Sequence, residues 1–305
     1  MGVWIDSDMG FDDIAAVLVA RHLGVAVDGL SLVHGVVPLV QVRRNAAGAA
    51  RAFGWDFPIH SGRALPVLGR LETAERILGP TGIPTAGAGL PDAPDLPASD
   101  AFDALSAWLA RTDDARILAL GPLTNIAALA LARPDLAARI ADLTWMGGGV
   151  TSGNHTASAE FNAYADPEAL AIVIAHGLPL RMVDLDLCRK VVATPADVAT
   201  VRAAGGANAG LIADLFAAYV DIGVSRGRPG MAIYDPSAAV AFLRPDLVTF
   251  RASRIDVALD AGLTRGRTVV ETRASHAAPN AHYAVDVKAD EALSIVLGAL
   301  REAAS

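Results

Sequence analysis

The sequence is short of cysteine, of basic residues and of long apolar runs. Cys188 is the only cysteine among 305 residues, so no internal disulfide can form, and a lone cysteine is typical of a reducing compartment. The net charge of −8 argues against nucleic acid and anionic membrane surfaces as partners. Runs such as 14–20 and 169–175 are too short to span a bilayer, and no basic segment precedes the first apolar run. We expect a cytoplasmic protein that binds neither nucleic acid nor membrane.

Aromatic residues are also scarce, at 5% of the chain, whereas small and aliphatic residues are abundant. Such a composition suits close packing of helices on a sheet. Short apolar segments alternate with helical patterns, and those read as strands include 3–5, 30–34, 116–120, 142–146 and 180–185. This alternation predicts an α/β fold with a mostly parallel, doubly wound sheet. Because no linker or internal repeat is present, we expect a single domain over residues 1–305.

Several segments depart from that alternation. Residues 79–98 are rich in Gly, Pro, Thr and Asp and are too long for a simple connection, which favours a lid or binding loop. Residues 194–224 show a helical pattern, and 223–230 form a second, basic-tinged loop. Near the C-terminus, residues 255–287 indicate β-hairpin strands, and 289–303 a last helix.

The most unusual stretch is the beginning of the chain. A short apolar strand is followed by four aspartates within eight positions: Asp6, Asp8, Asp12 and Asp13. Carboxylates packed so closely repel one another, and the stretch contains no Lys or Arg. A hard divalent cation with oxygen ligands would neutralise them. Ligands of open parallel sheets bind beyond the carboxyl ends of strands, where these aspartates and the glycine-containing turns 121–125 and 147–149 are expected.

Three other interpretations of the acidic stretch were weighed. An EF-hand loop beginning at Asp6 would need Gly and Glu where the chain has Phe11 and Val17. A structural zinc site needs Cys or His clusters, which are absent from the sequence. The strand-end Asp6-Ser7-Asp8 resembles that of haloacid-dehalogenase-type phosphotransferases, in which the first Asp is the nucleophile and Mg²⁺ the cofactor. That alternative lacks a recognisable later Lys and acidic pair.

Taken together, the motifs resemble those of the inosine/uridine-type nucleoside hydrolases. Residues 6–13 are similar to that family's Asp-x-Asp-Pro-Gly-x-Asp-Asp signature, with Met9 in place of Pro. Residues 120–126 resemble its Gly-Pro-Leu-Thr-Asn turn. The remaining similar segments are 146–149, 153–154, 159–162 and 166–169 of its ribose-binding region, Asp235-Pro236 at its last metal ligand, and 263–266 and 279–280 of its C-terminal β region. The resemblance therefore covers nearly the whole chain.

This resemblance implies a Ca²⁺-dependent enzyme that hydrolyses the N-glycosidic bond of ribonucleosides, or of a close analogue, to free base and ribose. It also implies a homodimer or homotetramer. The implied Ca²⁺ ligands are the carboxylates of Asp8, Asp13 and Asp235 and the backbone carbonyl of Leu120. Asp8 would also take a proton from a metal-bound water, and Asp6 would support these groups from behind.

The resemblance also implies a ribose pocket. The residues that would hold the sugar hydroxyls are Asp12, Asn154, Glu160 and Asn162. The pocket would be lined by Met146 and Phe161. Such a pocket suits the reaction, because N-glycoside hydrolysis develops positive charge on the sugar and carboxylates and amides stabilise it.

Three positions that meet the base depart from the family pattern. Tyr234 stands where the pattern has the His that protonates the leaving group, Val36 replaces an Asn, and Leu78 replaces a loop His. Tyr234 is a candidate catalytic residue, either as a proton donor or by stacking on the base. The sequence leaves the preferred base open. These replacements also motivate a further hypothesis, a nucleoside-binding protein with weak or lost hydrolase activity.

Overall fold

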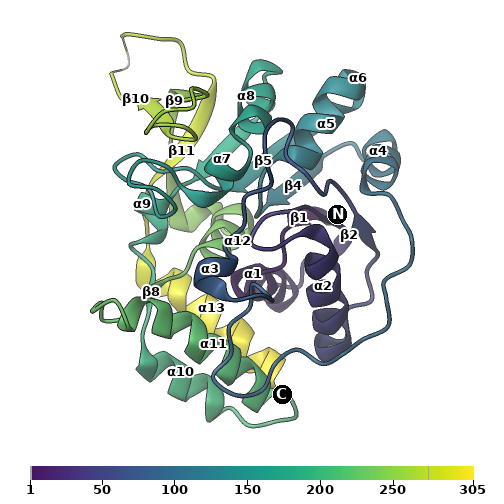
Figure 1. Ribbon diagram of the computed structural model, residues 1–305, viewed down its shortest axis with the longest axis vertical. Coiled ribbons are helices and arrows are strands. Elements are labelled where there is room, and N and C mark those ends of the chain that lie inside the picture. Colours follow the sequence, from purple (N-terminus) through teal and green to yellow (C-terminus); the bar gives the residue numbers. More distant parts are fainter. Residues whose placement is uncertain (1, 274) are drawn as a thin grey trace.

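The computed structural model describes residues 2–273 and 275–305, and Figure 1 shows a central sheet flanked by helices. The sheet has nine strands in the order β10-β9-β11-β6-β5-β4-β1-β2-β3. Its strands are β1 (Val3–Ser7), β2 (Val27–Leu32), β3 (Ile59–Ser61), β4 (Ala115–Ala119), β5 (Ile140–Met146), β6 (Leu180–Val183), β9 (Val248–Val257), β10 (Thr268–Glu271) and β11 (Ala281–Val287). Neighbouring strands are parallel from β3 to β11. The predicted α/β fold is confirmed.

An antiparallel extension completes one edge of the sheet. β9 pairs with both β10 and β11 in antiparallel fashion, as the expected C-terminal hairpin requires. β9 begins at Val248, seven residues before the start expected from the sequence. A separate antiparallel pair, β7 (Val192–Ala193) with β8 (Met231–Ala232), lies outside the main sheet.

The helices are connected to the strands mostly as the sequence predicts. They are α1 (Phe11–His22), α2 (Leu39–Phe53), α3 (Glu75–Leu78), α4 (Ala101–Arg111), α5 (Thr124–Ala132), α6 (Pro134–Ala137), α7 (Phe161–Ala165), α8 (Pro167–Ala175), α9 (Leu185–Cys188), α10 (Pro195–Arg202), α11 (Ala209–Val224), α12 (Asp235–Leu243) and α13 (Ala289–Ala304), with a short 3₁₀ helix at Pro245–Leu247. The helical pattern over 194–224 is two helices rather than one. Gly205 and Gly206 separate them, with φ of 73° and 100°, values that side chains rarely adopt.

The sheet divides the hydrophobic core into two layers. In β1, Val3 and Ile5 pack on one face while Trp4 packs on the other, as the period of two in a strand requires. Residues of α1, α2, α11, α12 and α13 join the first layer, and residues of α4, α5, α6 and α8 join the second. With helices on both faces, the sheet is doubly wound as predicted (Figure 1).

The strand order determines where a site can form. β1 and β4 are neighbours at the centre, with β2 and β3 on one side and β5 and β6 on the other. The direction of the connections reverses between β1 and β4, and such switch points leave a crevice at the carboxyl ends of the strands. Asp8 follows β1 and Leu120 follows β4, so both lie at this crevice. Within the described residues, no helix combines the length and apolar character needed to cross a membrane.

Candidate active site

All of the site residues predicted from the sequence line one cavity at the switch point. The cavity has a volume of about 130 Å³. Its lining includes Asp8, Asp12, Asp13, Leu120, Met146, Asn154, Glu160, Phe161, Asn162, Tyr234 and Asp235. Asp6 lies behind the cavity rather than in its wall, fully buried. The structure thus brings the predicted residues together, while their roles remain predictions.

The turn between β1 and α1 presents the aspartates to this cavity. Met9 has a φ of 53°, the one left-handed non-glycine residue among those described. Two backbone amides hold the turn: the Met9 N–H donates to Ser7 Oγ at 3.0 Å, and the Gly10 N–H donates to Asp13 Oδ2 at 2.8 Å. The Ser7 hydroxyl in turn donates to Asp13 Oδ1 at 2.5 Å. Asp13 is therefore fixed in orientation before any ligand binds.

The Asp8 carboxylate is fixed from a different strand. Its Oδ2 accepts a hydrogen bond from the Val36 backbone N–H at 2.7 Å. A Cβ atom at Gly35 would lie 1.9 Å from the same oxygen, so only glycine allows this close approach. The contact uses the backbone at position 36, and replacement of the family's Asn by Val36 leaves it intact.

The carboxylates form a buried acidic centre. Ligand oxygens of Asp12, Asp13 and Asp235 lie within 4.8 Å of one another, an arrangement that could hold a metal ion. Burial raises the pKa of Asp12 to about 7 and the pKa of Asp235 well above its usual range, and repulsion between the carboxylates adds to both shifts. Burial and the charge of Asp13 likewise raise the pKa of Asp8. Because these shifts reflect uncompensated negative charge, a divalent cation with oxygen ligands fits the centre.

The structure differs from the resemblance in one detail of this centre. The resemblance assigns Asp12 to the sugar and Asp8 to the ion, whereas the close carboxylate group consists of Asp12, Asp13 and Asp235. Tyr219 contributes to this difference, since its hydroxyl lies 3.3 Å from Asp12 Oδ2 and donates to the Ala232 carbonyl at 2.9 Å. The pattern of aspartates in the sequence contains no signal for this tyrosine.

Glu160 and Asn162 face the acidic centre from the segment that opens α7. Glu160 accepts backbone hydrogen bonds from Gly148, Asn162 and Ala163 at 2.8, 2.9 and 3.0 Å. Burial nevertheless raises its pKa to about 7. The Asn162 side-chain amide donates to the carbonyls of Leu120 and Met146 at 2.8 and 3.1 Å. One amide thus links the carboxyl ends of β4 and β5 at the cavity wall.

The turn after β4 is mainly structural. Asn125 donates to Asp6 Oδ1 at 2.7 Å and to the Leu32 carbonyl at 3.1 Å, and its own Oδ1 accepts from the Arg63 N–H at 2.9 Å. It therefore joins the ends of β1, β2 and the segment after β3. Burial raises the pKa of Asp6 to about 7, and its Oδ2 has no hydrogen-bond partner. The Gly-Pro-Leu-Thr-Asn motif thus supports the acidic turn from behind.

The wall that would meet the base is less polar. Val36, Leu78 and Tyr234, the three departures from the family pattern, all line the cavity. Burial raises the pKa of Tyr234 to about 12. A hydroxyl that holds its proton so tightly is a weak proton donor near neutral pH. The geometry therefore favours stacking or packing as the role of Tyr234.

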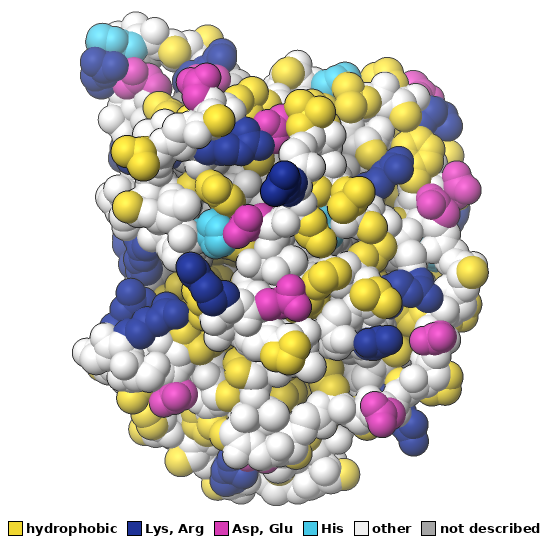
Figure 2. Space-filling view, viewed as in Figure 1, with side chains coloured by type: hydrophobic (Ala, Val, Ile, Leu, Met, Phe, Trp, Pro, Cys, Tyr) yellow, Lys and Arg dark blue, Asp and Glu magenta, His cyan; other side chains and the backbone are white. Residues whose placement is uncertain are grey.

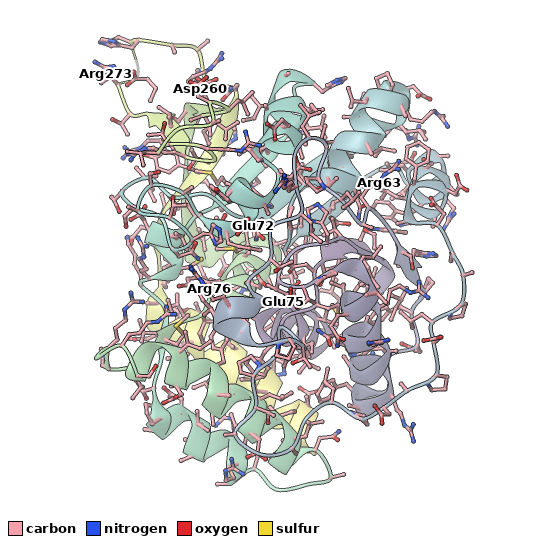
Figure 3. All side chains as sticks on the ribbon, viewed as in Figure 1. Arg63, Glu72, Glu75, Arg76, Asp260 and Arg273 are labelled. Atoms are coloured by element: carbon pink, nitrogen blue, oxygen red, sulfur yellow. The ribbon has the colours of Figure 1, made fainter. Side chains whose placement is uncertain are left out.

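The cavity wall also contains residues that the sequence did not point to. His155 packs against Phe161 and Tyr164, with ring centroids 5.3 and 4.7 Å apart, and its Nε2 lies 3.2 Å from Glu72 Oε1. Figure 3 places Glu72 beside α3, near the centre of this face. Arg226 lines the same cavity from the loop after α11. The basic character of that loop was the only sequence signal for Arg226.

This fold and site define an α/β enzyme with a carboxylate centre at the switch point of its sheet. A family model, the inosine–uridine preferring nucleoside hydrolases, matches residues 3–294, and the chain belongs to this family. It is therefore a nucleoside hydrolase that acts on ribonucleosides, as the sequence motifs predicted.

Individual relatives differ in the bases they prefer. The chain is 29% identical to the pyrimidine-specific ribonucleoside hydrolase RihB of Escherichia coli over 88% of this chain and 86% of that protein. It is 33% identical to an uncharacterised protein of Schizosaccharomyces pombe over 95% and 90% of the two chains. The structure resembles a purine-preferring ribonucleoside hydrolase from Gardnerella vaginalis, with a TM-score of 0.91, 25% identity and coverage of 100% and 99%. These relatives do not indicate one base for this chain.

Proposed function

We propose that the chain hydrolyses ribonucleosides with a bound Ca²⁺ ion and with Asp8 as the proton acceptor. The reaction adds the hydroxyl of water to the anomeric carbon and breaks the bond to the base nitrogen. The water proton passes to Asp8, and the base leaves with a proton at its nitrogen. The observation that carries the proposal is the convergence of Asp8, Asp13 and Asp235 in one buried cavity.

Asp8, Asp13, Asp235 and the Leu120 carbonyl would hold the ion, with Asp12 close enough to join them. When bound, Ca²⁺ would lower the pKa of a nearby water and attract the sugar hydroxyls. The elevated pKa of Asp8 suits a proton acceptor, and the Val36 N–H keeps its carboxylate directed into the cavity.

The ribose would be held by groups that already have fixed positions. Glu160 is oriented by three backbone N–H groups, and Asn162 by two carbonyls. Asn154 Oδ1 accepts from the Phe161 N–H at 3.0 Å, which leaves its amide nitrogen for the sugar. Negative groups around the sugar stabilise the positive charge that develops as the base leaves. A 2′-deoxyribonucleoside, which lacks one hydroxyl, should react more slowly.

Substitution of Asp8 tests this proposal. Asp8→Asn keeps the shape of the side chain but removes the proton acceptor and one negative charge. We expect ribose release from adenosine, inosine, uridine and cytidine to fall by about a hundredfold or more, and calorimetric Ca²⁺ affinity to fall with it. Asp260→Asn, on an exposed loop far from the cavity (Figure 3), is the matched control. Unchanged turnover in Asp8→Asn would refute the assigned role.

A binding protein without activity is the second candidate. The specific observation in its favour is the unreactive character of the base-side wall, with Leu78 and the high pKa of Tyr234. It predicts ribonucleoside binding by calorimetry without release of ribose from any of the four substrates. The family membership of the chain favours the hydrolase. The oligomeric state and the cytoplasmic location stay predictions.

A further inference from the structure

A second cavity adjoins the catalytic cavity on its base side. It has a volume of about 570 Å³ and lies between α11 and the segment that runs from α3 to residue 86. The Ala86 N–H donates to the Asp214 carbonyl at 3.0 Å, which joins that segment to α11. The two cavities share four lining residues: Ile77, Pro84, Ile222 and Arg226. We call the second cavity the outer groove.

The sizes of the two cavities divide a nucleoside between them. One water needs about 10–15 Å³ of such space, so the catalytic cavity of about 130 Å³ holds about ten waters. That is the bulk of a ribose, which has ten non-hydrogen atoms, and it leaves little room for a base. With the sugar at the carboxylates, a base against Leu78 and Tyr234 must extend towards the shared residues.

The walls of the outer groove indicate what could lie beyond the base. Ile77, Ala217, Ala218 and other apolar residues form most of its lining, and Ile77 is 44% exposed, a high value for isoleucine. Figure 2 shows hydrophobic side chains at the surface among the charged ones on the face that carries α3. An apolar ligand would cover such a surface favourably.

The polar residues of the groove are balanced in charge. Asp221 and Arg226 both line it, and neither forms an ion pair with any residue in 2–273 or 275–305. A ligand with a strong charge of either sign would be attracted by one of them and repelled by the other. The groove therefore suits an uncharged arm that is mainly apolar, with hydrogen-bonding groups available at its end.

We propose that the outer groove is a subsite for a substituent on the leaving base. The substrates would then include ribonucleosides whose exocyclic base nitrogen carries an apolar arm of several carbons. This inference rests on the proposed hydrolase function and extends it, because it assigns the shared residues and α11 to the recognition of the arm. The arm takes no part in bond cleavage, and the bond to the ribose breaks as for the parent nucleoside.

The experiment compares parent and arm-bearing substrates in the native protein and in Ala218→Trp. Ala218 lines the outer groove without lining the catalytic cavity, and a Trp side chain there would fill the groove. The substrate pairs are adenosine with N6-benzyladenosine and cytidine with N4-benzylcytidine. Ala107→Trp is the matched control, an exposed position on α4 outside both cavities.

In the native protein, we expect the benzyl compound to have a kcat/KM at least equal to that of its parent. In Ala218→Trp, the ratio of benzyl to parent kcat/KM should fall by about tenfold or more, which corresponds to loss of contact with one aromatic ring. The kcat/KM of the parent should stay within about twofold in both Trp variants, since the ribose and its contacts are unchanged.

Dissociation constants measured on an Asp8→Asn background give the same ratio without turnover. Failure of hydrolysis and failure of the groove are therefore distinguishable results. An equal penalty for the benzyl arm in the native protein and in Ala218→Trp would overturn the inference. So would a response of 5′-O-benzyladenosine, in place of N6-benzyladenosine, to the Trp substitution, because the groove would then receive the 5′ side of the ribose.

Discussion

Asn125 provides the sharpest test of how the acidic turn is supported. Its side chain is 7% exposed and makes three hydrogen bonds that join the ends of neighbouring strands. Asn125→Ala would remove all three and leave the Leu32 carbonyl and the Arg63 N–H without these partners. It would also leave Asp6 with the Ser31 hydroxyl as its remaining side-chain hydrogen bond.

The expected loss of stability follows from these contacts. A neutral hydrogen bond contributes about 0.5–1.5 kcal/mol and one to a charged group about 1.5–3 kcal/mol, so the three together contribute about 3–5 kcal/mol. Urea unfolding followed by tryptophan fluorescence measures this loss at constant m-value. Asn208→Ala is the control, because Asn208 donates one side-chain hydrogen bond, to the Ala52 carbonyl at 3.0 Å. A loss for Asn125→Ala no larger than about 1 kcal/mol, or no larger than that of the control, would refute the reasoning.

Three further predictions concern the site itself. In the chelated protein, burial raises the pKa of Asp6 and Glu160 to about 7, so the folded state keeps protons that the unfolded chain releases above about pH 4. Its melting temperature should fall as the pH rises from about 5 to 7.5, and added Ca²⁺ should raise it more at pH 7.5 than at pH 5; the opposite order would contradict this account. Tyr234→Phe should keep kcat/KM within about tenfold, because a hydroxyl with a pKa of about 12 donates poorly, and a hundredfold loss would instead identify Tyr234 as the acid. Glu72→Gln should raise KM by about two- to fivefold at low salt and less at high salt, since its contact with His155 is half-exposed; a large effect on kcat alone would exclude this positioning role.

The sequence predicted the fold well, because the apolar segments are short and regularly alternate with helical patterns. It also placed every proposed site residue at one cavity, because the acidic and Glu-Phe-Asn motifs occur at strand ends. The break between α10 and α11 was missed, since Gly205 and Gly206 interrupt a pattern that otherwise continues.

The residues missed at the site share a physical cause. Tyr219 and His155 reach the cavity from the middle of a helix and from a polar loop, where their own neighbours carry no motif. The contact between His155 and Glu72 joins positions 83 apart in the chain, and single-sequence patterns do not encode such pairings. The groupings within the acidic centre likewise depend on side-chain directions that spacing alone does not determine.

The distance along the chain between the carboxylates has a consequence for folding. Asp13 and Asp235 meet in space, although 222 positions separate them (235 − 13) and most of the sheet is formed by residues in between. Closing so long a loop is entropically unfavourable until the intervening strands have paired. The complete ligand set therefore assembles late in folding. A luminescent lanthanide ion added during refolding would consequently report the final docking of α12 against α1, and not the earlier collapse of the chain.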